Sequence, residues 1–179
     1  HGGVVLARSF AADRAGMASP VKVFPVPVAV HWPLLVAIPD TPLATSEARR
    51  VLPKLYSRVD LIHNVQSAMT LVLALTQGRG EWLREALSDR VHHPYRAQLC
   101  PLLPALTELA GTEGVHGVAL SGAGPSVLMF LDESADANAI RRRVEDHIRC
   151  RQLTAELRFT SIGALGAKES FAMSAMAAP

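Results

Sequence analysis

Apolar residues near the start of the chain form short runs that proline and glycine interrupt. Residues 1–10 read HGGVVLARSF, residues 21–30 read VKVFPVPVAV and residues 33–40 read PLLVAIPD. Runs of Val, Leu and Ile bounded by proline are typical of β-strands that neighbour one another or lie at a sheet edge. We therefore predict a strand in each of the three segments.

Helical spacing of apolar and polar positions begins at residue 45. Residues 45–53 read TSEARRVLP, in which Thr45 is suited to cap the amino terminus of a helix and Pro53 to end it. Residues 80–89 predict a further helix, and residues 91–111 predict a connection that leads into another.

A longer helix is predicted between these segments, over residues 60–78, with Asp60 as its cap and Gly78 as its stop. The middle of this helix is apolar on nearly every side. A helix of that kind is usually surrounded by other parts of the protein, so we expect it to be buried.

The last third of the chain has the clearest periodicity. Residues 114–120 and 126–132 predict two strands around a short turn, residues 134–151 an amphipathic helix and residues 153–165 a final strand. With residues 33–40 as the first strand, the order is strand, helices, strand, strand, helix, strand. This is the split β-α-β order of a ferredoxin-like α+β fold with inserted helices.

Composition indicates a globular protein with a modest charge. The 179 residues are 49% hydrophobic and carry a formal net charge of +2. The arginines at residues 141–143 lie in the predicted amphipathic helix without interleaved aromatic residues, so we interpret them as a solvated face and expect no nucleic-acid partner. Cys100 and Cys150 lack metal-ligand spacing and suggest no disulfide framework, which favours the cytoplasm as the location.

No membrane-spanning segment is expected, because prolines repeatedly break the apolar stretch over residues 21–39. The chain begins without an initiator Met, and its opening resembles a strand entered midway. We expect it to be a fragment or a processed piece of a longer protein.

Thr45 and Arg49 are the first candidates for chemistry. They lie four residues apart and therefore share one face at the start of a helix. A hydroxyl group, a guanidinium group and a helix amino terminus together suit a carboxylate or a phosphate. The alternative, favoured by these residues alone, is that Thr45 only caps the helix and Arg49 only faces water.

The segment DRVHHPYR, residues 89–96, is the second candidate. Pro94 restricts the backbone around it and so helps to fix the direction of Arg96. His92 and His93 are of a type that binds metals or moves protons, but no acidic motif accompanies them. Surface histidines, or histidines with ordinary hydrogen-bond partners, are the favoured interpretation.

The turn SGAGPS is the third candidate. Its glycines can adopt positive φ angles and leave backbone N–H groups open to an anion, but a plain hairpin needs the same residues for geometric reasons. The hairpin interpretation is favoured for the turn considered alone. Its residues are Ser121, Gly122, Ala123, Gly124, Pro125 and Ser126.

Taken in order, TSEARRVLP, HNVQSAMTLVLAL, DRVHHPYR and GVALSGAGPSVLMF resemble the carboxy-terminal half of homoserine kinases, members of the GHMP small-molecule kinase superfamily. The resemblance runs from about Gly2 to Ala167. It implies three regions: residues 1–30 as the last strands of a truncated amino-terminal ATP-binding domain of the ribosomal protein S5 domain 2-like fold, residues 31–167 as the GHMP kinase C-terminal domain, and residues 168–179 as a loose tail.

The resemblance also implies an activity. Homoserine kinases transfer the γ-phosphoryl group of ATP to the hydroxyl group of L-homoserine, a step of threonine biosynthesis, with Mg²⁺ neutralising phosphate charge. It implies that Arg49 and Arg96 bind the substrate carboxylate, that Thr45 lies beside the substrate as the candidate catalytic residue, and that residues 121–126 form the floor of the active site. We assign no metal ligand in this chain, and the resemblance suggests a homodimer.

Two motifs of the family do not occur in this sequence: the Pro-x-x-x-Gly-Leu-Gly-Ser-Ser-Ala-like loop that cradles the ATP phosphates, and the His-Pro-Asp-Asn segment. We therefore expect a truncated kinase that is inactive alone, and that is poorly soluble or self-associating because sheet edges and apolar faces are uncovered. Two alternatives remain open: another GHMP kinase, of the mevalonate or sugar type, and a non-catalytic amino-acid-binding regulatory module.

Overall fold

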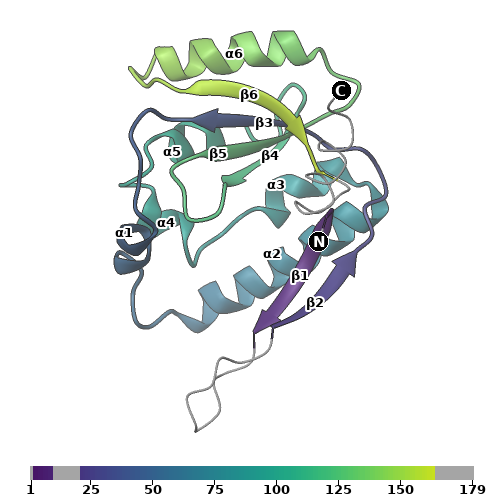
Figure 1. Ribbon diagram of the computed structural model, residues 1–179, viewed down its shortest axis with the longest axis vertical. Helices are drawn as coiled ribbons and strands as arrows, with labels where there is room; N and C mark the ends of the chain where they lie inside the picture. The colour runs from purple at the N-terminus through teal and green to yellow at the C-terminus, as the bar shows by residue number, and fades with distance from the viewer. Residues whose placement is uncertain (1, 10–20, 164–179) are drawn as a thin grey trace, which may run out of the picture.

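The computed structural model describes residues 2–9 and 21–163. The predicted tail, residues 168–179, lies outside the described residues. Two sheets are present in the described chain (Figure 1). The smaller is an antiparallel hairpin of two strands, and the larger has four. The strands are β1 (Val4–Ser9), β2 (Val21–Val26), β3 (Pro33–Ile38), β4 (Val115–Leu120), β5 (Val127–Leu131) and β6 (Glu156–Ser161).

The four-stranded sheet has the order β4-β5-β3-β6, and every neighbouring pair is antiparallel. This order, with one helix between β5 and β6 and several between β3 and β4, confirms the predicted ferredoxin-like α+β fold. The helices are α1 (Thr45–Arg50), α2 (Arg58–Gln77), the 3₁₀ turn η1 (Gly80–Trp82), α3 (Leu83–Ala86), α4 (His93–Arg96), α5 (Leu102–Thr107) and α6 (Ala137–Arg149).

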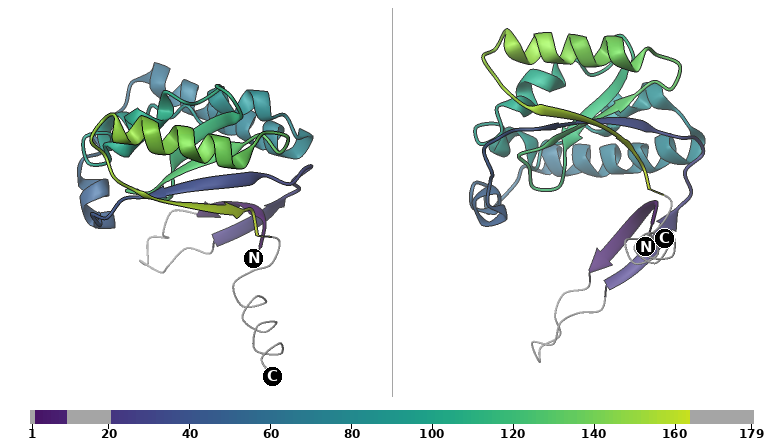
Figure 2. Two further views of the ribbon diagram at one scale, coloured as in Figure 1. Left: turned by 90° about the horizontal axis from the view of Figure 1, so that it is seen from above. Right: turned by 45° about the horizontal axis from the view of Figure 1, so that its top comes forward.

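Apolar side chains leave both faces of this sheet, because successive residues of a strand point to opposite sides. Leu35 and Met129 are fully buried in a cluster with α5 and with Val144 of α6. Their neighbours Leu34 and Phe130 lie in a second cluster with α2 and α3. Helices α5 and α6 therefore cover one side of the sheet, and α2 and α3 the other (Figure 2).

The two sides differ in how completely they are covered. Helix α6 is amphipathic, as predicted, and buries its apolar stripe. The prediction that α2 is buried was wrong: only Ser67, Ala74 and Leu75 of its residues are buried. Large apolar side chains of its first four turns face solvent, among them Val65 and Met69, which are 60% and 64% exposed.

Helix α2 is also the one described helix that is long and apolar enough to cross a membrane by length and composition alone. A single helix of this kind is weak support for a membrane span. Its carboxy-terminal half belongs to the core cluster on the sheet, and the Ala29 N–H donates a hydrogen bond to the Leu75 carbonyl.

Two of the predicted helix caps were wrong. The N-cap of α1 is Ala44, so Thr45 is the first helical residue and makes no capping hydrogen bond. The N-cap of α2 is Ser57, whose hydroxyl group accepts a hydrogen bond from the Asp60 N–H and donates one to the Asp60 carboxylate. Gly78 does end α2, as predicted, and its backbone is left-handed.

Candidate active site

The SGAGPS segment forms the turn between β4 and β5. The Ser121 N–H donates to the Ser126 carbonyl over 2.9 Å, and the Gly124 N–H donates to the Ser121 carbonyl over 3.2 Å. Gly122 and Gly124 have φ angles of +64° and +92°, as the sequence predicted. A Cβ atom at Gly124 would lie 2.8 Å from the Cys100 sulfur, whereas one at Gly122 would meet nothing within 4 Å. The turn is thus packed at Gly124 and open at Gly122.

Arg96 of α4 reaches this turn and also helix α1. Its Nε donates to the Ala48 carbonyl over 3.2 Å, and its Nη1 donates to the Gly122 carbonyl over 3.4 Å. The residue is only 8% exposed. In residues 2–9 and 21–163, no Asp or Glu forms an ion pair with it. A buried cation that is bound only by carbonyl groups is costly, and an anionic ligand would lower that cost.

Thr45 and Arg49 lie one turn apart on α1 and are both exposed. Ala48, between them in sequence, is fully buried and provides the carbonyl that Arg96 contacts. Through Arg96, three segments that are distant in sequence come together: the short helix α1, helix α4 and the β4–β5 turn.

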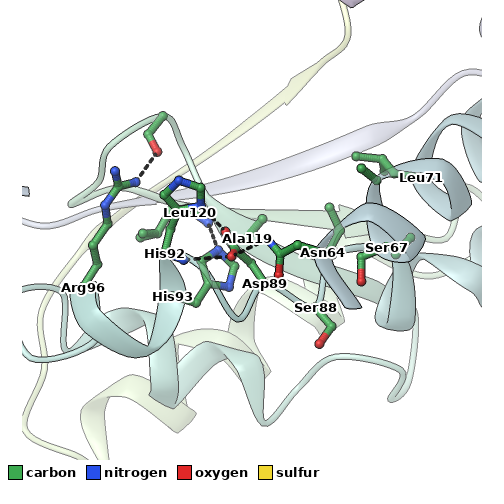
Figure 3. Close-up of a pocket in the computed structure, with 14 residues that line it drawn as sticks. Asn64, Ser67, Leu71, Ser88, Asp89, His92, His93, Arg96, Ala119 and Leu120 are labelled. Atoms are coloured by element: carbon green, nitrogen blue, oxygen red, sulfur yellow. Dashed lines mark hydrogen bonds and ion pairs between the residues drawn. The ribbon is translucent and has the colours of Figure 1, made fainter. Parts of the chain in front are cut away.

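A pocket of about 380 Å³ lies on one side of this junction (Figure 3). Arg96, His93 and Gly122 line it, together with Asn64 and Ser67 of α2. Thr45, Arg49 and the other residues of the turn are not part of its lining. Pro125 instead borders a separate cleft of about 450 Å³ that includes Glu47 and Cys100.

Asp89 is the residue of this region that the sequence interpretation missed. Its Oδ1 accepts hydrogen bonds from Asn64 Nδ2 at 2.9 Å and from the backbone N–H groups of Val91 and His92 at 2.7 and 2.8 Å. Its Oδ2 lies 2.8 Å from His92 Nδ1. Burial raises the pKa of Asp89, but the hydrogen bonds from Asn64, His92 and Val91 outweigh burial and hold the pKa below its usual value.

His93 contacts the end of β4. Its Nε2 accepts a hydrogen bond from the Leu120 N–H over 3.5 Å, which requires an unprotonated Nε2. Burial lowers the pKa of His93, and the nearby charges of His92 and Arg96 act in the same direction against the opposing effect of Asp89. His92 and His93 thus have ordinary hydrogen-bond partners, as the favoured interpretation held.

The Asp and His side chains at this junction are not arranged around a common metal position. Within the described ranges, no group of three or more His, Cys, Asp and Glu side chains is placed to hold a metal ion. Cys100 is buried beside the turn and Cys150 is exposed, and both are free thiols.

Comparison with known proteins identifies the family to which this part of the chain is similar. Residues 71–150 match the family model described as GHMP kinases C terminal. Over these residues the chain carries a GHMP kinase C-terminal domain. The matched region includes α4 with Arg96 and the β4–β5 turn, so two of the three segments that meet at the junction belong to the family domain.

Among curated relatives of this GHMP kinase domain are three homoserine kinases. That of Nostoc sp. strain PCC 7120 is 46% identical over 117 residues, which cover 65% of this chain and 39% of the relative. Those of Microchaete diplosiphon and Deinococcus radiodurans are 40% and 44% identical, over 74% and 65% of this chain and 43% and 38% of the relatives. The chain thus spans about two fifths of the length of these relatives.

Solved structures share the fold. A homoserine kinase from Cytophaga hutchinsonii superimposes with a TM-score of 0.73 at 21% identity, over 92% of this chain and 50% of that protein. A mevalonate kinase from L. major, in complex with R-mevalonate, superimposes with a TM-score of 0.61 at 16% identity, over 93% of this chain and 51% of that protein. Both confirm the fold of the GHMP kinase domain, and neither similarity distinguishes between acceptor substrates.

Proposed function

We propose that this chain is the carboxy-terminal part of a homoserine kinase, which transfers the γ-phosphoryl group of ATP to the hydroxyl group of L-homoserine and forms O-phospho-L-homoserine for threonine biosynthesis. Identities of 40% to 46% with homoserine kinases from three organisms support this assignment. The structural observation that carries it is the buried guanidinium group of Arg96, which has carbonyl partners but no paired carboxylate among the described residues.

Phosphoryl transfer of this kind depends mainly on positioning and electrostatics. In the proposed site, Arg96 binds the α-carboxylate of homoserine, and Arg49 reaches the same group from α1. Planar guanidinium groups suit a carboxylate because each can donate two parallel hydrogen bonds. Thr45, one turn before Arg49, lies beside the substrate as the candidate catalytic residue, and residues 121–126 form the floor of the site.

Further parts of the proposal concern the whole enzyme. The loop motif that cradles ATP phosphates does not occur in this sequence, so we expect the chain alone to be inactive. The described residues offer no carboxylate cluster for Mg²⁺, and we place that ion on the ATP phosphates without assigning it a ligand here. We expect the enzyme to act in the cytoplasm as a homodimer, without nucleic acid or membrane as partners.

A substrate panel on the complete protein that contains this chain tests the assignment. We expect ATP-dependent phosphorylation of L-homoserine and little turnover of mevalonate or galactose. The similarity in fold to mevalonate kinase makes a mevalonate-type kinase the second candidate. Phosphorylation of mevalonate but not homoserine would establish that candidate, and homoserine binding without any phosphoryl transfer would support the non-catalytic module.

Arginine variants test the proposed contacts. We expect Arg96→Leu and Arg49→Leu each to raise the KM for homoserine roughly 10- to 100-fold, since each loses hydrogen bonds between charged groups worth about 1.5–3 kcal/mol. The KM for ATP should change little. Arg142→Leu, at an exposed arginine of α6, is the matched control and should leave both constants unchanged. Normal homoserine kinetics in both test variants would refute the assigned contacts.

A further inference from the structure

The short helix α4 carries Arg96 but has little to hold it in place by itself. It consists of four residues, and its N-cap, His92, makes no side-chain capping hydrogen bond. The placement of Arg96 therefore depends on the segments that flank the helix, and the segment before it carries the side-chain contacts described next.

That segment is fixed by Asp89. The Asp89 carboxylate accepts the N–H groups of Val91 and His92, which precede α4 and have no place in its hydrogen-bond ladder. The carboxylate thus fixes the backbone of the two residues that lead into α4, although it does not cap the N–H groups of the helix itself.

Asp89 is in turn held by α2. The Asn64 side chain donates from Nδ2 to Asp89 Oδ1 over 2.9 Å and accepts the Arg90 N–H at its Oδ1 over 2.8 Å. One amide group thus binds both the side chain of Asp89 and the backbone of the next residue, which fixes the orientation of the amide. Figure 3 shows Asp89 between Asn64 and His92, on the same side of the pocket as His93.

A continuous set of contacts therefore leads from α2 to the turn. It runs from Asn64 through Asp89 to the start of α4, and from Arg96 to the carbonyl groups of Ala48 and Gly122. Both Arg96 contacts are long, at 3.2 and 3.4 Å, so they hold the guanidinium group weakly by themselves.

We propose that Asp89, held by Asn64 of α2, is a positioning residue that anchors the start of α4 and so keeps the Arg96 guanidinium group aimed at the substrate carboxylate. The inference rests on the proposed function for its catalytic consequence. Its structural content, that Asp89 controls the placement of Arg96, holds for any anionic substrate at this junction.

Kinetics of the complete protein test the catalytic consequence. We expect Asp89→Ala to raise the KM for homoserine about tenfold, with kcat and the KM for ATP within about twofold of wild type. Asp89→Asn keeps an oxygen that can accept the Asn64, Val91 and His92 hydrogen bonds, so it should restore most of the loss. Glu85→Ala removes an exposed carboxylate from α3 and serves as the control that changes nothing.

A double-mutant cycle separates positioning from general destabilisation. In the Arg96→Leu background, Asp89→Ala should raise the KM by less than twofold, because the side chain that Asp89 positions is already gone. Independent, multiplicative effects of the two substitutions would overturn the proposal, as would a parallel loss of kcat and of affinity for both substrates.

A second measurement needs no substrate and uses the 179-residue chain itself. In protein labelled with ¹⁵N-arginine, the Nε–H signal of Arg96 is assigned by its loss in Arg96→Leu. We expect its exchange with solvent to accelerate at least tenfold in Asp89→Ala and not in Glu85→Ala. Unchanged exchange in Asp89→Ala would overturn the positioning role. Accelerated exchange in a protein that does not phosphorylate homoserine would refute only the proposed function.

Discussion

The helices that cover the two sides of the four-stranded sheet differ in how much apolar surface they expose to solvent. On one side, α6 buries Val144 completely and turns ion pairs such as Arg141 with Glu145 toward solvent. On the other side, α2 packs through Ala74 and Leu75 but presents Val65 and Met69 to solvent. A helix that buries all of its apolar surface against a sheet presents a polar face to solvent. The apolar outer face of α2 is uncovered by the described residues, whereas Asn64 and Ser67 of the same helix line the pocket that contains Arg96.

Charged substitutions at matched valines should show the largest contrast between the two sides. Val144→Asp places an unpaired charge in the core, so we expect it to lower the free energy of unfolding by about 4 kcal/mol or more. Val65→Asp should change that free energy by no more than about 0.5 kcal/mol, because Val65 is exposed. Urea denaturation followed by circular dichroism measures both. Equal destabilisation would show that α2 is buried in solution.

Self-association is the next largest effect. We expect the 179-residue chain to associate through the exposed face of α2, and Ile62→Gln, Val65→Gln and Met69→Gln together to raise the concentration at half-association at least tenfold, equivalent to about 1.4 kcal/mol. Sedimentation velocity over a concentration series measures this.

The matched control places the same number of glutamines on the outer face of α6, at Arg142, Asp146 and Arg149. This variant should associate like the wild type. Monomeric behaviour of the unmodified chain at all concentrations would contradict the expectation for α2.

The pH dependence of stability should show the smallest difference, and it arises on the α2 side. Burial lowers the pKa of His93 below the usual value of about 6.5, so the folded state favours the neutral ring. The stability that this contributes is complete above the usual pKa and is lost as the pH falls toward the lowered pKa.

His93→Gln keeps an acceptor near the Leu120 N–H but cannot be protonated. We therefore expect a flatter dependence of melting temperature on pH between about 7 and 5. His31→Gln, at an exposed histidine, is the control and should follow the wild-type profile. A His93→Gln profile that is as steep as that of the wild type would exclude His93 as the source.

The strands and α6 could be predicted because the spacing of their apolar residues agrees with the face that each element buries. The apolar positions of α6 recur at helical spacing, and Ile140, Val144 and Ile148 are buried. For α2, the same kind of pattern gave a wrong prediction of burial. The apolar surface of a helix indicates that burial would stabilise it. The sequence of the helix does not say whether the residues that bury it belong to the described chain.

The junction could be predicted only in part. The segments were found from their residue types, and the positive φ angles at Gly122 and Gly124 follow from local turn chemistry. The burial of Arg96 depends on carbonyl groups of Ala48 and Gly122, which are distant in sequence and carry no side-chain signal. Asp89 had a detectable signal, since an acidic residue shortly before a short helix is suited to capping backbone N–H groups.

The pairing of β3 determines when this strand can fold during synthesis. Strand β3 forms early in the chain, yet both of its partners come late: Leu35 pairs with Met129 and with Phe159. Contacts of such high sequence separation slow folding, because a long loop must close before they form. During synthesis, β3 therefore leaves the ribosome with two unpaired edges, one of which waits for β5 and the other for β6. Of the two inner strands of the sheet, β3 is made first and pairs last, so we expect the nascent chain to be most prone to aggregation at this strand.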